Sequence, residues 1–592
     1  MLARVTDPRQ RGASLMGATV HAEGASKNNK LTAIFGSRYK TNKMLLGTLD
    51  TEGEYDPTFV DFQTYLTYNF CPKFEVGLLG YYGQTSYLFQ PVSRQTSFGT
   101  ISNIQNLYVF FDGNEEDMFA SGLLASTFTY KANTNNKYAL TLSAYSTRES
   151  ETYDIESAYW LQDLDPSSGS TDNPNYIWEN GNSKDVGSEL DHARNSLNGE
   201  VLNAAFRATH LSSNNKITWE TKIQSENFEE EINQWNYLDS AGYSLPYNGT
   251  SIELQNSYNA HISTETYRTT AFIQDDYNFN TEKGKISLSG GIRGNYWTFN
   301  QELLISPRAA IVFEPYWKRQ VMFRFATGIY YQSPFVKELH TPDGTMNNDI
   351  KAQKSIQYVF TTTYTFEALN RRFKLSSEFY YKQLSQLNPY NIDNVRIVYS
   401  GKNNAKGYAT GADFKINGEI VKGLESWATL SLMKTEENLF DDSYTTTNSD
   451  GTTTTTYPGY IPRPTDQRFN FSLYFQDYIP KYPSIKAHLN LVFGSGLPFG
   501  PPDSPRYKST LRMPPYRRVD LGVSKEITGS LLDPDKRFGP FKRLWLGIDI
   551  FNLFNINNTI SYYWVTDIRS QQYAVPNYLT SRRMNFKVVA DF

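Results

Sequence analysis

The last nine residues of the chain, 584–592, alternate apolar with polar side chains and end on an aromatic residue. Successive side chains of a β-strand point to opposite faces, so the apolar residues of this segment share one face of a strand. They are Met584, Phe586, Val588, Ala590 and Phe592, and the opposite face carries Asn585, Lys587 and Asp591. Because chain termini are usually frayed, five apolar residues in phase predict that this terminus is held in a sheet.

The same period of two recurs along the chain in segments of about ten residues. Representative segments are 321–331, 373–382, 468–476, 487–493 and 544–550, with apolar positions that include Phe323, Phe325, Leu473, Leu491 and Ile548. About ten residues is the length that a tilted strand needs to cross a membrane. No apolar run is long enough for a helical span, and no segment keeps helical periodicity over several turns. The sequence therefore predicts an all-β fold, a transmembrane antiparallel β-barrel of about 21–22 strands.

The composition agrees with a barrel in a bilayer. Aromatic residues make up 15% of the chain, which suits the aromatic girdles at the two edges of a membrane-spanning barrel. The formal net charge of −4 is small for 592 residues and indicates no nucleic-acid partner. Cys71 is the single cysteine, which excludes an internal disulfide and a C-x-x-C site. Residues 1–8 contain no apolar core of a signal peptide.

The connections between the expected strands alternate between short and long. Short polar turns are expected at 70–73, 132–136, 212–215, 369–371 and 417–419, and long loops at 87–115, 158–193, 231–258, 332–352, 386–403, 438–465, 498–514 and 557–577. Two connections break the rule, a short one at 299–301 on the long-loop side and a long one at 526–541 on the other. The threonine-rich tract at 445–456 is expected to be a mobile loop tip. Short periplasmic turns and long extracellular loops are typical of transmembrane barrels.

Several short phrases follow one another in the second half of the chain. They are Ser306-Pro307-Arg308, Tyr330 through Leu339, Lys354 through Tyr358, Asn403 through Gly411, Arg463 through Arg468, Gly494 through Phe499, Pro514 through Leu521, and Asn552-Leu553-Phe554-Asn555. By their order and spacing, these phrases resemble the barrel of TonB-dependent receptors, especially those of the Bacteroidetes type. The closing segment 584–592 is likewise similar to the terminal strand of bacterial outer-membrane barrels.

The resemblance implies an outer-membrane receptor that imports a scarce nutrient, such as a siderophore, a vitamin or a glycan, by energised transport. It implies contact with the TonB–ExbB–ExbD complex through an N-terminal part, with outer-membrane lipid, and with an extracellular ligand. Receptors of this family carry a plug inside the barrel, and no segment here leaves room for one, because apparent strands begin near Ser14.

Counting strands from Ser14 to Phe592 gives about 21, an odd number, whereas bacterial single-chain barrels have even numbers. We therefore expect 1–13 to be a loop remnant and 14–592 to be the barrel of a chain truncated at its N-terminus, without signal peptide, plug or first strand. The first and last strands are then expected to fail to pair.

No motif of enzyme chemistry is present, and we predict no catalytic, metal or cofactor residues and no enzyme activity. The histidines His21, His192, His210, His261, His340 and His488 are scattered singly and are interpreted as ordinary barrel or loop residues. The acidic groups Glu229-Glu230-Glu231, Asp441-Asp442, Asp163 and Asp165 lack the spacing of a calcium loop and are interpreted as solvated charge. Trp178, Trp235, Trp297, Tyr237, Tyr243 and Tyr247 could stack on a ligand or form the upper aromatic girdle, which we favour.

Two transport functions are considered first, and a third class is an outer-membrane enzyme or adhesin, of which the enzyme would need a catalytic constellation that the sequence does not show. A large barrel encloses a lumen that needs a plug, which favours a nutrient transporter. The alternative is a passive porin-like channel, in which facing charges would form a constriction. The substrate-binding residues and the substrate itself are not identified by the sequence.

Overall fold

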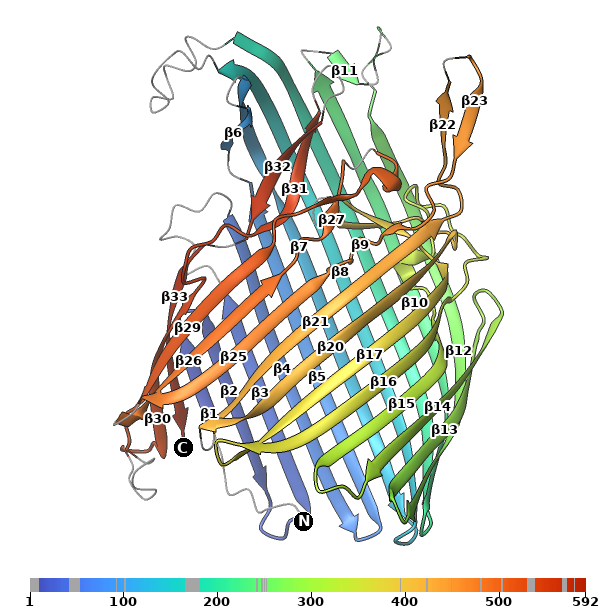
Figure 1. The fold of residues 1–592 in the computed structure, drawn as a ribbon, viewed down its shortest axis with the longest axis vertical. Coiled ribbons are helices and arrows are strands. Elements are labelled where there is room, and N and C mark those ends of the chain that lie inside the picture. Colours follow the sequence, from blue (N-terminus) through green and yellow to red (C-terminus); the bar gives the residue numbers. More distant parts are fainter. Residues whose placement is uncertain are drawn as a thin grey trace.

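The computed structural model describes residues 10–592 except 42–53, 92, 101–102, 165–181, 241–242, 246, 248, 250, 252, 394–395, 422–423, 449, 480–481, 502–503, 530–537, 567–571 and 580. Within these ranges the chain is almost entirely β-structure (Figure 1). Among the described residues, no helix is long or apolar enough to cross a membrane.

Twenty-two antiparallel strands form one closed barrel. They are β1 (Gln10–Ser14), β2 (Gly17–Ala25), β3 (Leu31–Thr41), β4 (Glu54–Cys71), β5 (Phe74–Gln90), β7 (Asn103–Lys131), β8 (Asn136–Leu164), β9 (Asn182–Leu211), β10 (Asn215–Ser240), β12 (Asn256–Thr281), β13 (Gly284–Trp297), β14 (Glu302–Pro315), β15 (Gln320–Gln332), β16 (Gln353–Ala368), β17 (Arg371–Leu387), β20 (Ala405–Val421), β21 (Leu424–Leu439), β25 (Phe469–Ile479), β26 (Tyr482–Gly494), β29 (Tyr516–Glu526), β30 (Arg543–Phe551) and β33 (Arg583–Asp591). The remaining elements are β6 (Arg94–Thr100), β11 (Tyr243–Leu245), β18 (Tyr390–Asp393), β19 (Arg396–Tyr399), β22 (Tyr444–Thr447), β23 (Thr453–Thr456), β24 (Ile461–Pro462), β27 (Pro498–Phe499), β28 (Leu511–Arg512), β31 (Thr559–Thr566), β32 (Gln572–Tyr578) and the 3-10 helices η1 (Val336–Glu338) and η2 (Arg506–Lys508).

The barrel closes between its first and last strands. β1 pairs with β33 from Gln10 opposite Asp591 to Ser14 opposite Lys587, and it pairs with β2 on its other side. The predicted loop at residues 10–13 and the predicted unpaired edges are therefore wrong, and the strand number is even. β1 was not predicted because its five residues carry no apolar alternation. The strand forms because an open edge would leave a row of backbone groups unpaired.

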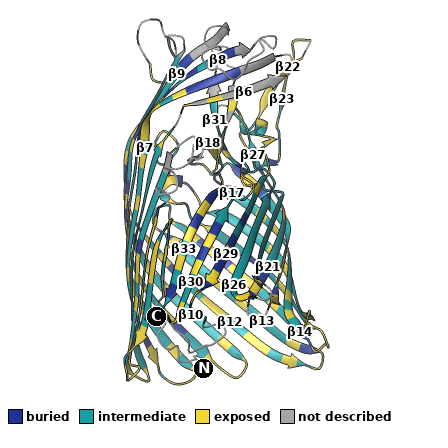
Figure 2. Cartoon of the chain, turned by 90° about the vertical axis from the view of Figure 1, so that its left-hand side faces the viewer, coloured by how far each residue is buried: buried dark blue, intermediate teal, exposed yellow. Residues whose placement is uncertain are grey.

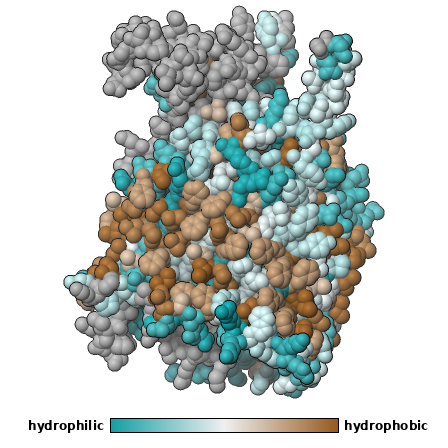
Figure 3. Space-filling view, in the orientation of Figure 1, coloured by the Kyte–Doolittle hydropathy of each residue, from teal (hydrophilic) through white to brown (hydrophobic). Residues whose placement is uncertain are grey.

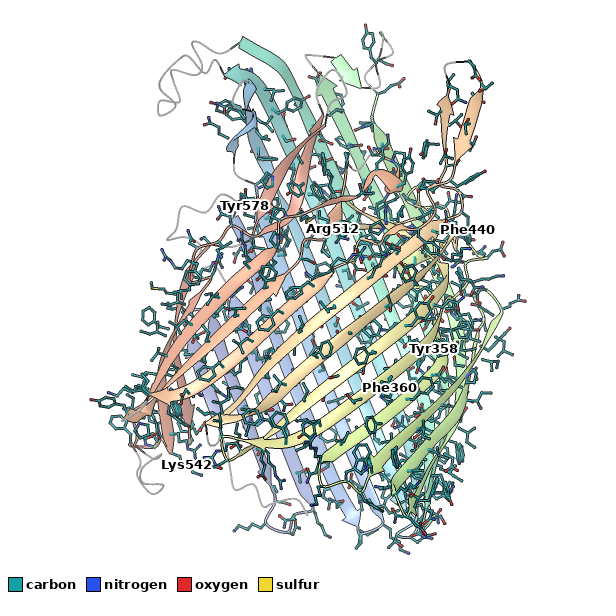
Figure 4. All side chains as sticks on the ribbon, viewed as in Figure 1. Tyr358, Phe360, Phe440, Arg512, Lys542 and Tyr578 are labelled. Atoms are coloured by element: carbon teal, nitrogen blue, oxygen red, sulfur yellow. The ribbon has the colours of Figure 1, made fainter. Side chains whose placement is uncertain are left out.

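The predicted apolar belt is confirmed. Phe325, Ile548 and Phe586 are 43%, 44% and 52% exposed, and they share the outer face of their strands with Phe323, Leu473 and Leu491. Apolar surface crosses the middle of the face shown in Figure 3, and Tyr358 and Phe360 project from the outer wall in Figure 4. The alternate side chains face the lumen, where Asn585 and Asp549 are buried and Lys587 Nζ lies 2.7 Å from Asp549 Oδ1.

Most connections fall where the sequence places them. Turns occur at 72–73, 132–135, 212–214 and 369–370, and the exceptional connections at 298–301 and 527–542 are short and long as predicted. The turn predicted at 417–419 is wrong, because β20 continues to Val421. Asn417-Gly418 reads as a turn signal, but Gly418 lies within the strand, where a Cβ atom would meet Cδ1 of Phe373 at 2.5 Å.

The strands on one side are far longer than the predicted ten residues. β7, β8 and β9 contain 29, 29 and 30 residues, so much of the predicted loops 87–115, 158–193 and 231–258 is strand. Alternation of polarity disappears beyond the apolar belt because both faces meet polar surroundings there, while the backbone pairing continues. The threonine-rich tract likewise forms a hairpin, β22–β23, that projects from the same end (Figure 1).

Candidate functional site

The long strands make the mouth of the barrel asymmetric. β7, β8, β9 and β10 rise well above the opposite wall, where β25, β26 and β29 contain 11, 13 and 11 residues (Figures 1 and 2). The connecting segments around 333–352, 388–404, 461–468 and 497–513 gather at this end of the barrel. The mouth is therefore a vestibule with a high wall on one side and packed loops on the other.

The loop between β15 and β16 is fixed to the high wall by two ion pairs. Lys337 Nζ lies 3.1 Å from Glu149 Oε2 on β8, and His340 Nε2 lies 3.4 Å from Glu230 Oε2 on β10. Glu149 and Glu230 occupy one row of the sheet, each opposite Leu197 of β9. The loop thus reaches from β15 across the inner side of the barrel to the long strands.

The loop also packs on the inner face of β13. Leu339 and Ile350 form a buried cluster with Trp297, over whose ring the guanidinium of Arg268 lies at 4.1 Å. Trp297 is only 3% exposed. It is therefore a core residue of the loop contact, and it belongs neither to the outer girdle nor to an open platform for a ligand.

The pKa values of the two basic groups in this contact are raised. Burial alone would lower the pKa of His340, but the adjacent Glu230 carboxylate raises it above its ordinary value of about 6.5. Burial would likewise lower the pKa of Lys337, and the Glu149 carboxylate raises it. Neither Glu230 Oε2 nor His340 Nε2 meets the geometry of a hydrogen bond, so the His340 contact is electrostatic. Its strength therefore depends on the protonation of His340.

A buried carboxylate joins this loop to the next one. Glu338 is 3% exposed, and it accepts hydrogen bonds from the Phe335 N–H at 2.8 Å and from Gln353 Nε2 at 3.2 Å. Burial raises the pKa of Glu338, and the Phe335 hydrogen bond opposes this rise. Asn388 Nδ2 donates to the backbone carbonyl of Glu338 at 3.4 Å, and the Ser400 hydroxyl donates to Asn388 Oδ1 at 2.9 Å. Loops distant in sequence thus form one packed unit.

Two further buried carboxylates organise the loops of the low wall. Glu437 is completely buried and pairs with Arg463 at 3.0 Å and with Arg506 at 2.7 Å. Asp466 is also completely buried and pairs with Arg468 and with Arg512, which is labelled in Figure 4. Arg506 and Arg512 belong to the 497–513 segment, and their contacts with these two carboxyl groups fix the segment over the barrel wall.

An aromatic cavity of about 100 Å³ lies between these loops. The rings of Phe499 and Tyr562 stack with centroids 4.4 Å apart, and Trp564 lies 6.2 Å from Phe499. Arg506 also lines the cavity. Aromatic faces beside a guanidinium suit a flat or apolar ligand group that carries negative charge nearby.

Three carboxylates converge on the opposite, high wall. Ligand oxygens of Glu115, Asp117 and Glu151 all lie within 4.8 Å of one another, because the β7–β8 hairpin places Asp117 opposite Glu151. Such a group has the oxygen chemistry that a divalent cation requires. The sequence did not reveal this group, because the residues meet only through the register of a long hairpin. The turn at 132–135, which fixes that register, is the one signal that could have indicated it.

The histidines are not brought together. Their partners are Asp154 for His192 at 2.6 Å, Asn136 for His210 at 2.6 Å, Glu231 for His261 at 3.8 Å, Glu230 for His340 and Asp549 for His488 at 3.5 Å, and His21 lies on β2. Among the described residues, no group of possible metal ligands contains a histidine.

The other residues singled out in the sequence are dispersed. Glu230 alone of its acidic triplet lies in the loop contact, and Asp441 accepts from Asn404 Nδ2 at 3.2 Å. Trp235 stacks on the His192 ring at 4.8 Å, and Tyr247 is 63% exposed. Tyr237 is half-buried on β10, and Asp442 is half-buried beside Asp441. Asp165 and Trp178, with the side chains of Asp163 and Tyr243, lie outside the described residues.

Comparison with known proteins follows this geometry. A family described as "TonB dependent receptor-like, beta-barrel" matches residues 61–558. Among solved structures, a ferric enterobactin receptor (PfeA) mutant from Pseudomonas aeruginosa is 12% identical with a TM-score of 0.59, covering 99% of this chain and 80% of that chain. The siderophore receptor PiuA from Acinetobacter baumannii is 12% identical with a TM-score of 0.59, covering 100% of this chain and 82% of that chain. The ferric yersiniabactin uptake receptor FyuA from Yersinia pestis is 12% identical with a TM-score of 0.60, covering 99% of this chain and 80% of that chain. A search of the curated proteins found no match.

A closed barrel of 22 strands with an apolar belt and a deep vestibule defines a transport protein of the outer membrane. The family match extends over most of the chain, and the chain belongs to the TonB-dependent receptor β-barrel family. The tight turns are thus periplasmic and the vestibule is extracellular. The porin alternative is not favoured.

Proposed function

We propose that this protein imports a ferric chelate of the siderophore class, which it captures in the extracellular vestibule. The observation that carries the proposal is an aromatic cavity in the mouth of a barrel that belongs to a receptor family. The cavity lies beside Arg506, which is paired with Glu437. Ferric chelates present flat, often anionic groups, which aromatic rings and guanidinium groups recognise. The similar solved structures named above are receptors for such ligands, which supports the same class here.

We propose that energy for uptake comes from the TonB–ExbB–ExbD complex acting on the full product of the gene. The contribution of the barrel is to bind the ligand and to provide a lumen. We infer transport rather than catalysis, because the chain belongs to a receptor family and its barrel encloses a lumen.

Ligand binding to purified protein tests the substrate class. Ferric catecholate and hydroxamate chelates should quench the tryptophan fluorescence saturably, and Trp564→Ala should weaken the affinity by about tenfold, as expected for one stacking ring. Trp219→Ala, which removes an outward ring near the periplasmic turns, is the matched control and should leave the affinity unchanged. Saturable binding of cobalamin or an oligosaccharide, with no response to any ferric chelate, would reject the siderophore class.

A further inference from the structure

An apolar groove of about 690 Å³ lies on the outer wall where the barrel closes. Its volume falls in the range of roughly 300–1,000 Å³ that is typical of small-molecule pockets. Four adjacent strands contribute to it, β29, β30, β33 and β1. The outward residues that line it are Ala13, Leu15, Val523, Lys525, Ile527, Leu546, Ile548, Phe586 and Val588.

The floor of the groove consists of two rows of side chains that cross the strands. In one row, Val523 is opposite Ile548 and Ile548 is opposite Phe586, and the Leu15 N–H donates to the Phe586 carbonyl at 3.1 Å. In the other row, Lys525 is followed by Leu546, Val588 and Ala13. Ala13 contributes only a methyl group, so the second row leaves space above the wall where it reaches the closing strand β1.

The groove lies in the periplasmic half of the apolar belt. β29 runs downward to Glu526, and β33, on the other side of β30, ends at Asp591, close to the terminus marked C in Figure 1. The rows of Val523 and Lys525 thus lie near the periplasmic rim, with one further row, that of Leu544 and Ala590, below them. Only the chains and headgroups of the periplasmic leaflet reach this depth.

Charge is placed at one end of the groove only. Lys525 is the single charged side chain among its outward lining residues, and it is exposed. Lys542, labelled at the lower edge in Figure 4, precedes β30 and is also exposed. Neither side chain has an ion-pair partner among the described residues. A long lysine side chain near the edge of a bilayer extends its ammonium group to the headgroup level, where phosphates are its partners.

We propose that this groove binds one phospholipid of the periplasmic leaflet, with an acyl chain along Leu546, Phe586 and Val588 and with the phosphate bound to Lys525. The apolar lining provides the binding free energy for the chain, and the lysine fixes which end of the lipid enters. The lipid covers the outer side of the closing strand pair, which, like the pairing of β1 with β2, extends over only five residues. Lipid binding here is separate from ligand capture in the vestibule.

Native mass spectrometry of the purified, delipidated protein with dipalmitoyl phosphatidylglycerol tests the proposal. Wild type should retain one lipid, and Lys525→Gln should lower its affinity about fivefold, the effect expected for one lysine at a membrane surface. Ala13→Phe fills the groove and should abolish retention. Two variants away from the groove serve as controls. Lys354→Gln removes an outward lysine at the extracellular end of β16, and Ala33→Phe enlarges an outward alanine of β3. Both should bind the lipid as wild type does.

Folding of each variant is verified by the mobility shift that a folded barrel shows on heating in detergent gels. If Ala13→Phe fails to fold, Lys525→Gln alone decides, because it alters only an exposed side chain. Undiminished retention by the folded groove variants would overturn the proposal. Retention of lipopolysaccharide in place of the phospholipid, or a second copy of the chain occupying the groove, would overturn it as well.

Discussion

At the scale of single residues, the contact between His340 and Glu230 makes the vestibule loop sensitive to pH. The folded pKa of His340 lies above the ordinary value of about 6.5, so the ion pair stabilises the loop fully below that value. The stabilisation is lost as pH rises through the folded pKa. A nitroxide at Thr345→Cys, in a Cys71→Ser background, should therefore be immobile at about pH 5.5 and more mobile at about pH 8.5.

The variant His340→Gln separates this contact from the rest of the loop. The mobility of its nitroxide should no longer change over that pH range, because the variant lacks the imidazole that faces Glu230. An unchanged pH response in His340→Gln would show that another group controls the loop.

Arg506 joins the 497–513 segment to Glu437, Tyr390 and Pro462. Removing it in Arg506→Ala leaves Glu437 with Arg463 alone and should destabilise the 497–513 segment by about 3 kcal/mol, as expected when a buried pair loses a partner. Amide exchange of this segment should rise accordingly. The double variant Arg506→Met with Glu437→Gln should recover part of the protection, and failure to do so would mean that Arg506 acts through its other contacts, with Tyr390 and Pro462.

At the scale of strands, inner and outer positions should tolerate charge very differently. Leu473 faces lipid and Ser472, its neighbour on β25, faces the lumen. Leu473→Arg should therefore destabilise the assembled barrel by roughly 2–4 kcal/mol, whereas Ser472→Arg should have little effect. Folding yield in vesicles, read from the heat-dependent gel shift, measures both. Equal yields for the two variants would contradict the assigned facing.

The closing strand is tested by a proline. Ala13 pairs with Val588 on one side and with Ala18 on the other, so Ala13→Pro removes a ladder hydrogen bond in the middle of a sheet. The fraction of folded barrel should fall measurably below wild type. Lys27→Pro, in the turn between β2 and β3, is the control and should fold well, because Lys27 lies outside the paired strands. If Ala13→Pro folds fully, β1 does not close the barrel.

The elements that the sequence predicted well are those that cross the apolar belt. Alternation exists there because lipid and lumen impose different polarity on the two faces, as with Phe586 beside Lys587. The upper halves of β7, β8 and β9 escaped prediction because their two faces meet similar surroundings. β1 escaped prediction because its five residues carry no apolar alternation. Gly418 shows the converse error, since a turn signal lies within a strand where close packing against Phe373 favours glycine.

At the scale of the whole molecule, the class of protein could be predicted from the sequence and the site could not. Order and spacing of short phrases identify the family, because they mark how strands begin and end. The vestibule depends on long-range register and loop packing, such as Asp117 opposite Glu151 or Arg506 on Glu437, and no local pattern encodes these meetings.

The central claim is that this barrel belongs to an energised importer, and uptake of a labelled ferric chelate tests it most directly. Cells that carry the full gene should accumulate the label, and accumulation should stop when TonB is deleted or when the proton-motive force is dissipated, while surface binding persists. Accumulation that continues at the same rate in both conditions would contradict energised import and indicate passive passage through the barrel.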